Sequence, residues 1–352
     1  MDFKNLIDNE QALRKIIPSY PAIMDKRIQP HLDDYSLEFI ELASVALLGF
    51  DNHQLGMHYL DIKNNHFKIA SNNRLTFTMP NVEHSGFCLK SHCSLYFLIP
   101  GVGHGLRING HTVKTNEEGV SGALHLNFYI DEVYVHCSRA IVRSSLWKEP
   151  KFKMDKTLLK ALNNFQGKCN SLDSSIRSFI QSSPFIFLKT QDENGHCEIS
   201  PRGDPEQIVN IIDNNTLLIA ERAGNKVAKS MRNILLNPSV CLSFLIPQVH
   251  NTLTIIGKAQ LSYDIELLTP LTINKKTPKV GILISIQSIA FTNQQDSLAS
   301  SNLWHTDSYI NEKQLTKFSK VLSYHMNGTG LLGKASTPLI NAIVRHDLKN
   351  LY

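Results

Sequence analysis

The segment SPRGDP, residues 200–205, combines residue types that can bind an anion or a carbonyl-rich ring. The guanidinium of Arg202 can donate paired hydrogen bonds to such a ligand. Gly203 has no side chain and permits a backbone geometry that other residues resist. The same composition is also typical of a surface turn closed by a pair of Arg202 with Asp204. The segment occurs once in the chain, which makes it the first candidate for a binding loop.

A second candidate anion site lies further along, in ERAGNKVAKSMRNILLNP. A turn of Gly224 and Asn225 precedes a helical pattern whose first turns contain Lys226, Lys229 and Ser230. A helix N-terminus with two lysines three residues apart on one face favours phosphate binding. A solvated basic helix face is the alternative interpretation. The segment is not a Walker loop, because the G-x-x-x-x-G-K pattern is absent.

A third candidate is YVHCSRAIVRSSLW, residues 134–147, in which two arginines lie four residues apart. Arg139 and Arg143 share a face if this segment is helical. His136 and Cys137 precede them. A Cys–His nucleophilic pair is disfavoured here, because adjacent residues usually point in different directions.

Composition narrows the class of protein. The chain has 352 residues, of which 42% are hydrophobic and 19% charged, and its formal net charge is +5. These values are typical of globular proteins, and the absence of a dense basic run argues against nucleic-acid binding. No apolar run approaches the ~18–20 residues of a membrane helix, and no secretory signal pattern begins the chain. The six cysteines form no C-x-x-C pair, so we expect reduced thiols and a cytoplasmic protein without a metal site.

The chain contains an internal duplication. Three anchors recur in the same order: EFIELASVALLGF (38–50) with SFIQSSPFIFLKT (178–190), SLYFLIPGVGHGLRING (94–110) with CLSFLIPQVHNTLTIIG (241–257), and SSLW (144–147) with SNLW (301–304). Each copy begins with a helical pattern and continues with short runs of Val, Ile, Phe and Leu between turn formers. Such runs predict one small antiparallel barrel per copy.

The predicted fold is therefore α+β, with two tandem antiparallel split β-barrels and flanking helices that form an internal pseudo-dimer. We expect the first copy over residues 1–155, the second over 156–304, and a helical C-terminal tail over 305–352.

Several of these motifs together resemble one family. SSPFIFLKT, SPRGDP, NNTLLIAERAGNK and SMRNILLNPSVCLSFLIP are similar to the N-terminal and middle portions of pyridoxamine 5'-phosphate oxidase-like FMN-binding split barrels. FLIPGVGHGLRINGH and VYVHCSRAIVRSSLW resemble the C-terminal portion of the same branch. The resemblance covers nearly the whole chain as two copies. It implies FMN held non-covalently in the cleft between two barrels, each of which contributes to the site.

The two copies have lost complementary parts of this pattern. Residues 60–64, LDIKN, take the place of SPRGD in the first copy. In the second copy Asn293, Gln294, Asp296 and Ser300 stand opposite His136, Cys137, Arg139 and Arg143. A pseudo-dimer with such losses retains one composite site, built from the front half of one copy and the back half of the other.

The resemblance then implies roles for the retained residues. Cofactor binding falls to Ser200, Pro201, Arg202, Gly203, Asp204, Asn225, Lys226, Lys229, Ser230 and Trp147. Catalysis and binding of an anionic substrate fall to His136, Arg139 and Arg143. The implied activity is FMN-dependent oxidation of a C–N bond in a small anionic metabolite, with dioxygen as acceptor. The alternatives are a non-catalytic flavin-binding or sensor protein, a haem or deazaflavin binder, and a scaffold without cofactor. A further homodimer is left open.

Overall fold

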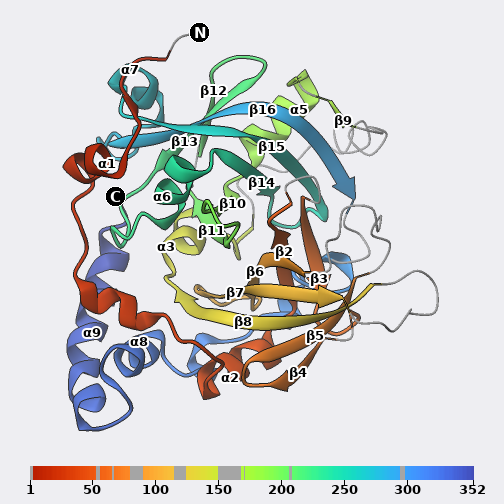
Figure 1. Ribbon diagram of the computed structural model, residues 1–352, viewed down its shortest axis with the longest axis vertical. Coiled ribbons are helices and arrows are strands. Elements are labelled where there is room, and N and C mark those ends of the chain that lie inside the picture. Colours follow the sequence, from red (N-terminus) through yellow and green to blue (C-terminus); the bar gives the residue numbers. More distant parts are fainter. Residues whose placement is uncertain are drawn as a thin grey trace.

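Two antiparallel sheets with the same strand order form the framework of the protein (Figure 1). The computed structural model describes residues 3–52, 56–65, 67–79, 90–114, 124–149, 168–169, 171–205, 208–293 and 298–352. The first sheet has the order β3 (Met57–Asp61), β2 (Val45–Phe50), β6 (Lys90–Leu98), β7 (Gly105–Lys114), β8 (Leu124–His136), β5 (Arg74–Met79) and β4 (Lys68–Ser71). The second has the order β11 (Cys197–Gly203), β10 (Phe185–Gln191), β14 (Ser239–Leu245), β15 (Asn251–Ser262), β16 (Val280–Asn293), β13 (Thr216–Glu221) and β12 (Val209–Ile211).

Strand for strand, the second sheet repeats the first, which confirms the predicted pair of tandem split barrels in an α+β fold. Even the irregularities recur. The ladder of β7 with β8 shifts register at Gly110, and that of β15 with β16 shifts at the equivalent Gly257. A Cβ at these glycines would lie 1.9 Å from the carbonyl oxygen of Tyr129 and 2.4 Å from that of Ser285. Only glycine fits at either bulge, so the duplication has kept both.

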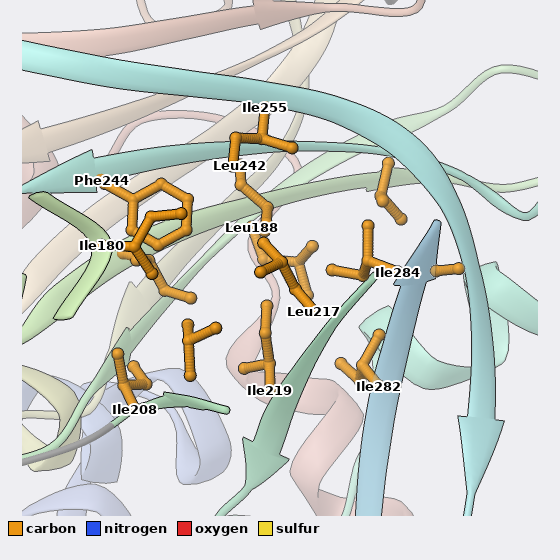
Figure 2. Close-up of a cluster of buried hydrophobic side chains, with 14 of the residues drawn as sticks. Ile180, Leu188, Ile208, Leu217, Ile219, Leu242, Phe244, Ile255, Ile282 and Ile284 are labelled. Carbon is orange, nitrogen blue, oxygen red and sulfur yellow. The ribbon is translucent and has the colours of Figure 1, made fainter. Parts of the chain in front are cut away.

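The central strands are buried on both faces, which explains their continuous apolar sequences. In β10, Ile186 and Leu188 point into the core of the second barrel, which Figure 2 shows around Leu188, Leu217 and Leu242. Phe185 and Phe187 point the other way, into a cluster shared by the two barrels. The equivalent strand β2 does the same with its own alternate residues. The barrels therefore meet in part through apolar faces.

Helices flank the sheets. In the described residues they are α1 (Glu10–Ile16), α2 (Asp34–Leu42), α3 (Arg139–Ser144), α5 (Ser174–Ser182), α6 (Lys229–Leu236), α7 (Ile265–Leu268), α8 (Phe318–Asn327) and α9 (Leu331–Lys349). Short 3-10 turns are η1 (Ala22–Arg27), η4 (Thr269–Leu271), η6 (Thr306–Ser308) and η7 (Glu312–Gln314). None of these helices has the length and hydrophobicity that a membrane crossing requires.

The first helix of the chain and the segment that begins the tail pack on different barrels. Near the N-terminus, β1 (Leu6–Ile7) pairs with β15 of the second sheet, and Leu13 of α1 enters the second core. The tail instead inserts Leu315 and Val321 into the first core. A second short strand, β9 (Lys168–Cys169), also joins the second sheet through β16. The limits 1–155, 156–304 and 305–352 stay a prediction, because residues 150–167 lie outside the described residues.

Candidate functional site

A cleft lies where α3 of the first barrel packs against β11 of the second. The contact depends on Gly203. A Cβ at this position would lie 2.1 Å from the carbonyl oxygen of Ala140 and 3.0 Å from the Ser144 side chain. The sequence interpretation, in which Gly203 supplied a special backbone geometry, is therefore corrected. Its φ angle is not among the positive values, and its lack of a side chain lets the helix approach the strand.

Most of the predicted site residues line this one cleft. His136, Arg139 and Arg143 come from the first barrel, and Ser200, Pro201, Arg202, Gly203, Asp204, Asn225, Lys229 and Ser230 come from the second. Polar contacts join the two sets directly. The amide of Asn225 donates to the hydroxyl of Tyr134 over 3.2 Å. Arg139 and Arg143 both donate to the carbonyl of Ala223, over 3.1 and 2.7 Å.

Lys226 lies outside the lining of the cleft. It precedes α6 rather than belonging to its first turns, and its φ of +62° is left-handed. The helix begins at Lys229, after Ala228 at φ +57°. These two left-handed residues turn the chain, so Lys226 lines a neighbouring cavity while Lys229 and Ser230 line the cleft. Of the residues predicted to bind phosphate, Lys229 and Ser230 therefore lie together in the cleft and Lys226 does not.

Trp147 also lies outside the lining. Its indole N–H donates to the carbonyl oxygen of Val102 over 2.6 Å, and its ring packs against Trp304 and Tyr309. This position holds the two barrels together, and the side chain has no donor left for a ligand in the cleft.

The cleft is strongly cationic. Its described lining carries seven cationic side chains (Arg27, Arg107, Arg139, Arg143, Arg202, Arg222 and Lys229) against four carboxylates (Asp25, Glu198, Asp204 and Glu221). The carboxylates fix individual arginines in place. Arg107 Nη1 lies 3.1 Å from Glu198 Oε2, Arg222 Nε donates to Asp204 Oδ2 over 2.6 Å, and Arg202 pairs with Glu221.

Three of these arginines still have unused donors. Arg107 Nε, Arg202 Nε and Arg222 Nη2 are buried and have no hydrogen-bond partner in the described part of the chain. A buried donor without an acceptor costs about 1–3 kcal/mol, so such groups usually face a ligand or ordered water. The cleft therefore presents guanidinium donors that suit a negatively charged or carbonyl-bearing ligand.

His136 contributes no positive charge to this field. Burial, together with the charge of nearby Arg107, holds the pKa of His136 well below its usual range. Its Nε2 lies 3.4 Å from Arg107 Nη1. A neutral imidazole here can accept a hydrogen bond from a ligand without adding to the excess of cations.

Residues 172–293 match a protein-family model described as pyridoxamine 5'-phosphate oxidase. The match spans most of the second barrel, from just before α5 to the end of β16. The comparison with curated proteins gave no match.

Among solved structures, HupZ of Group A Streptococcus is similar at 15% identity, over 35% of this chain and 94% of its own, with a TM-score of 0.30. General Stress Protein 26 of Bacillus anthracis matches at 18% identity, over 33% and 89%, with a TM-score of 0.26. HutZ, the heme storage protein of Vibrio cholerae, matches at 13% identity, over 34% and 93%, with a TM-score of 0.26.

On the opposite side of the pseudo-dimer, Asp61 belongs to the segment that replaces the SPRGD residues of the second barrel. This residue is 2% exposed, and its carboxylate accepts from Ser300 Oγ over 2.6 Å, from Asn64 Nδ2 over 2.8 Å and from the Lys63 N–H over 2.9 Å. Ser300 is the residue that aligns with Arg143. At the equivalent place a short hydrogen bond between the two copies thus replaces a cationic cleft.

Sequence reasoning left three functional candidates out of the site: Arg107, Glu198 and Arg222. All three line the cleft between the two barrels. A signal was present for two of them, because Arg107 and Glu198 are charged residues next to apolar ones in GLRI and CEI. Among the described residues no group of three or more His, Cys, Asp or Glu is placed to hold a metal ion.

Proposed function

We propose that the protein is an FMN-dependent oxidoreductase with one composite site per chain, formed by α3 and β8 of the first barrel and by β11 and α6 of the second. The observation that carries the proposal is a set of three buried guanidinium donors in the cleft, on Arg107, Arg202 and Arg222, which have no hydrogen-bond partner among the described residues. The match of residues 172–293 to the pyridoxamine 5'-phosphate oxidase family model supports a flavin as the ligand.

The residues present suit the two ends of FMN. At the start of α6, Lys229 offers an ammonium group, and the first N–H groups of a helix have no partner within the helix. The Ser230 hydroxyl already donates to Glu198 over 2.8 Å, so Ser230 would hold the phosphate through its backbone N–H. Arg202 and Arg107 would face carbonyl groups of the ring with their free Nε donors. When bound, the flavin supplies the acceptor for a hydride and its electrons.

Substrate binding falls to the face that α3 contributes. Arg139 and Arg143 would hold a carboxylate or phosphate, and neutral His136 would accept a hydrogen bond from an amine at the reacting carbon. These roles favour oxidation of a C–N bond in a small anionic metabolite, with dioxygen as the acceptor. A cytoplasmic location agrees with Cys93, Cys137, Cys197 and Cys241, which are free thiols.

The test is the purified chain itself. Release of one FMN per chain on denaturation, measured by absorbance and chromatography, is the expected result. Two flavins per chain would contradict the composite site, and a protein that takes up no FMN would contradict the function. A haem or deazaflavin spectrum would reassign the cofactor. Anaerobic bleaching of the flavin by small anionic amines then separates an oxidoreductase from a flavin-binding sensor.

Two variants assign the roles within the cleft. Arg202→Ala should abolish flavin retention, because a ring ligand loses its guanidinium partner. Arg143→Ala should keep the flavin and raise the substrate KM. An unchanged KM in a flavin-loaded Arg143→Ala chain would remove Arg143 from the substrate site.

A further inference from the structure

The C-terminus of the chain reaches the arginines of the cleft. In Figure 1 it lies near α6. Asp347 Oδ2 lies 2.8 Å from Arg139 Nη2. The carbonyl oxygen of Leu351 accepts from Arg143 Nε over 2.8 Å and from Nη2 of the same guanidinium. Both arginines that α3 contributes are therefore bonded to the chain's own tail.

Tyr352 lies in a slot formed by Arg143, Asp204, Arg222 and Lys276. The ring centroid of Tyr352 lies 5.4 Å from the guanidinium carbon of Arg143 and 5.6 Å from that of Arg222, which places the ring between two cations. Its hydroxyl donates to Asp204 Oδ1 over 3.2 Å, and Asp204 is fully buried. Its backbone oxygen accepts from Lys276 Nζ. Burial and the neighbouring Asp204 raise the pKa of the Tyr352 phenol, so the phenol stays a donor.

Tyr352 also borders a second cavity of about 420 Å³. Ile16, Ile17, Met231 and Val280 supply apolar walls of this cavity, and residues 221–225 line it and the cleft alike. Tyr352 thus lines this cavity and at the same time contacts Arg143, Asp204 and Arg222, which line the cleft.

The tail is held here by few and mostly polar contacts. Helix α9 ends at Lys349, and the side chain of Asp347 is 45% exposed. Segments with few buried apolar contacts open readily, whereas tethering gives a docked segment a high effective concentration. An external ligand of the same arginines must therefore compete with the tail.

We propose that residues 347–352 are an intramolecular ligand of the composite cleft, and that the slot between Arg143 and Arg222 binds a second molecule of the same chemistry. That molecule carries a phenol to donate to Asp204 and a carbonyl or carboxylate to accept from Arg143 and Lys276, as in a hydroxyphenyl amino acid or a peptide ending in tyrosine. We infer that this molecule is the substrate, and this inference rests on the function proposed above. Its binding to the slot is independent of that function.

The experiment uses a chain that ends at Asn350 and therefore lacks Leu351 and Tyr352. Its probes are the tripeptide Asn-Leu-Tyr, which is the chain's own C-terminus, and free tyrosine, both titrated by calorimetry. The truncated chain should bind the tripeptide at least tenfold more tightly than the full chain, because tethered Tyr352 no longer competes. Asn-Leu-Phe should bind about tenfold more weakly than Asn-Leu-Tyr, since it lacks the hydrogen bond to a carboxylate. The tripeptide Asn-Tyr-Leu is the control, because it has the same composition but does not end in tyrosine.

The full-length Tyr352→Ala chain repeats the test with the rest of the tail in place. The proposal can therefore still be tested if the chain that ends at Asn350 does not fold. Tyr324→Ala, a tyrosine on α8, is the matched control and should behave as the unaltered chain. Equal binding of the tripeptide to the full-length and Tyr352→Ala chains, or binding to neither, would overturn the proposal. A preference for free tyrosine over the tripeptide identifies an amino acid as the ligand, and the reverse identifies a peptide end.

The flavin content of each variant separates this inference from the proposed function. A chain that retains one FMN but binds no probe contradicts the slot alone. A chain that binds the probe through the slot but no FMN contradicts the flavin function alone.

Discussion

The indole rings of Trp147 and Trp304 lie 5.9 Å apart between centroids, and each makes the same bond in its own barrel. Trp147 donates to the carbonyl of Val102 over 2.6 Å, and Trp304 donates to that of Val249 over 3.2 Å. Val102 and Val249 are equivalent positions, at the ends of FLIPGV and FLIPQV. The pseudo-two-fold axis that relates the copies therefore passes between the two tryptophans.

The first prediction follows from this symmetric pair. Trp147→Phe and Trp304→Phe should each lower the free energy of unfolding by about 1–3 kcal/mol, because each leaves a carbonyl without its donor. Neither should change flavin retention, since both rings lie outside the cleft. Denaturant titration and flavin release measure the two effects. Loss of flavin from a folded Trp147→Phe chain alone would restore Trp147 to the cofactor site.

The second prediction concerns Gly203. Gly203→Ala places a methyl group against the Ala140 carbonyl and should shift α3 away from β11. We expect a loss of stability of about 1–3 kcal/mol together with weaker anion binding, because Arg139 and Arg143 move with the helix. Gly224→Ala is the matched control in the same cleft. Its added Cβ would meet only the Arg222 carbonyl at 3.8 Å, so stability should stay the same or rise slightly.

The third prediction separates the two lysines that the sequence grouped together. Lys229→Ala should weaken FMN binding about tenfold or more, the usual effect of losing a charged hydrogen bond to phosphate. Lys226→Ala should change it by about twofold at most, because Lys226 faces the other cavity. Riboflavin has no phosphate and should bind both variants equally. Equal losses of FMN affinity in the two variants would contradict the assignment of the phosphate to Lys229 rather than Lys226.

The fourth prediction is a pH dependence that arises from His104. This residue is 4% exposed, and its Nε2 lies 2.5 Å from the hydroxyl of Tyr35. Burial lowers the pKa of His104 to about 4, below the ordinary value of 6.5. Below pH 6.5 the unfolded chain therefore takes up the proton more readily than the folded chain. Stability should fall by about 3 kcal/mol as the pH falls from 6.5 to 4.

Urea titrations at several pH values measure this slope. His104→Gln keeps a polar partner for Tyr35 but does not titrate, so its stability should lose this part of the pH dependence. The same slope in both chains would assign the effect to other groups.

Several features could be predicted from sequence because they repeat or because they are missing from one copy. The paired FLIP strands and the SSLW and SNLW segments predicted two equivalent barrels, and the sheets have the same order. The solitary SPRGDP and HCSRAIVRS motifs predicted one site built from both copies. Arg202 and Arg143 do line one cleft. Their roles toward a flavin stay a prediction.

The individual roles within the cleft were less predictable. Gly203, Lys226 and Trp147 fit a family pattern by type and spacing, but a pattern does not say which neighbour a residue meets. Gly203 meets a helix from the other copy, 63 positions away at Ala140, and Trp147 meets the carbonyl of Val102. Arg222 was left out of the predicted site because its partner Asp204 is distant from it in the sequence.

The sequence by itself determined the duplication, the class of fold and the two halves of the site, because periodic apolar runs and shared motifs are local properties of the chain. Only the tertiary structure decided what those halves contact. In the described part of the cleft, its packing left three buried guanidinium donors without a hydrogen-bond partner. It also joined Asp61 to Ser300 on the opposite side and brought Tyr352 to Arg143 from 209 residues away. Such contacts depend on where distant segments meet in space, and no spacing along the chain encodes that meeting.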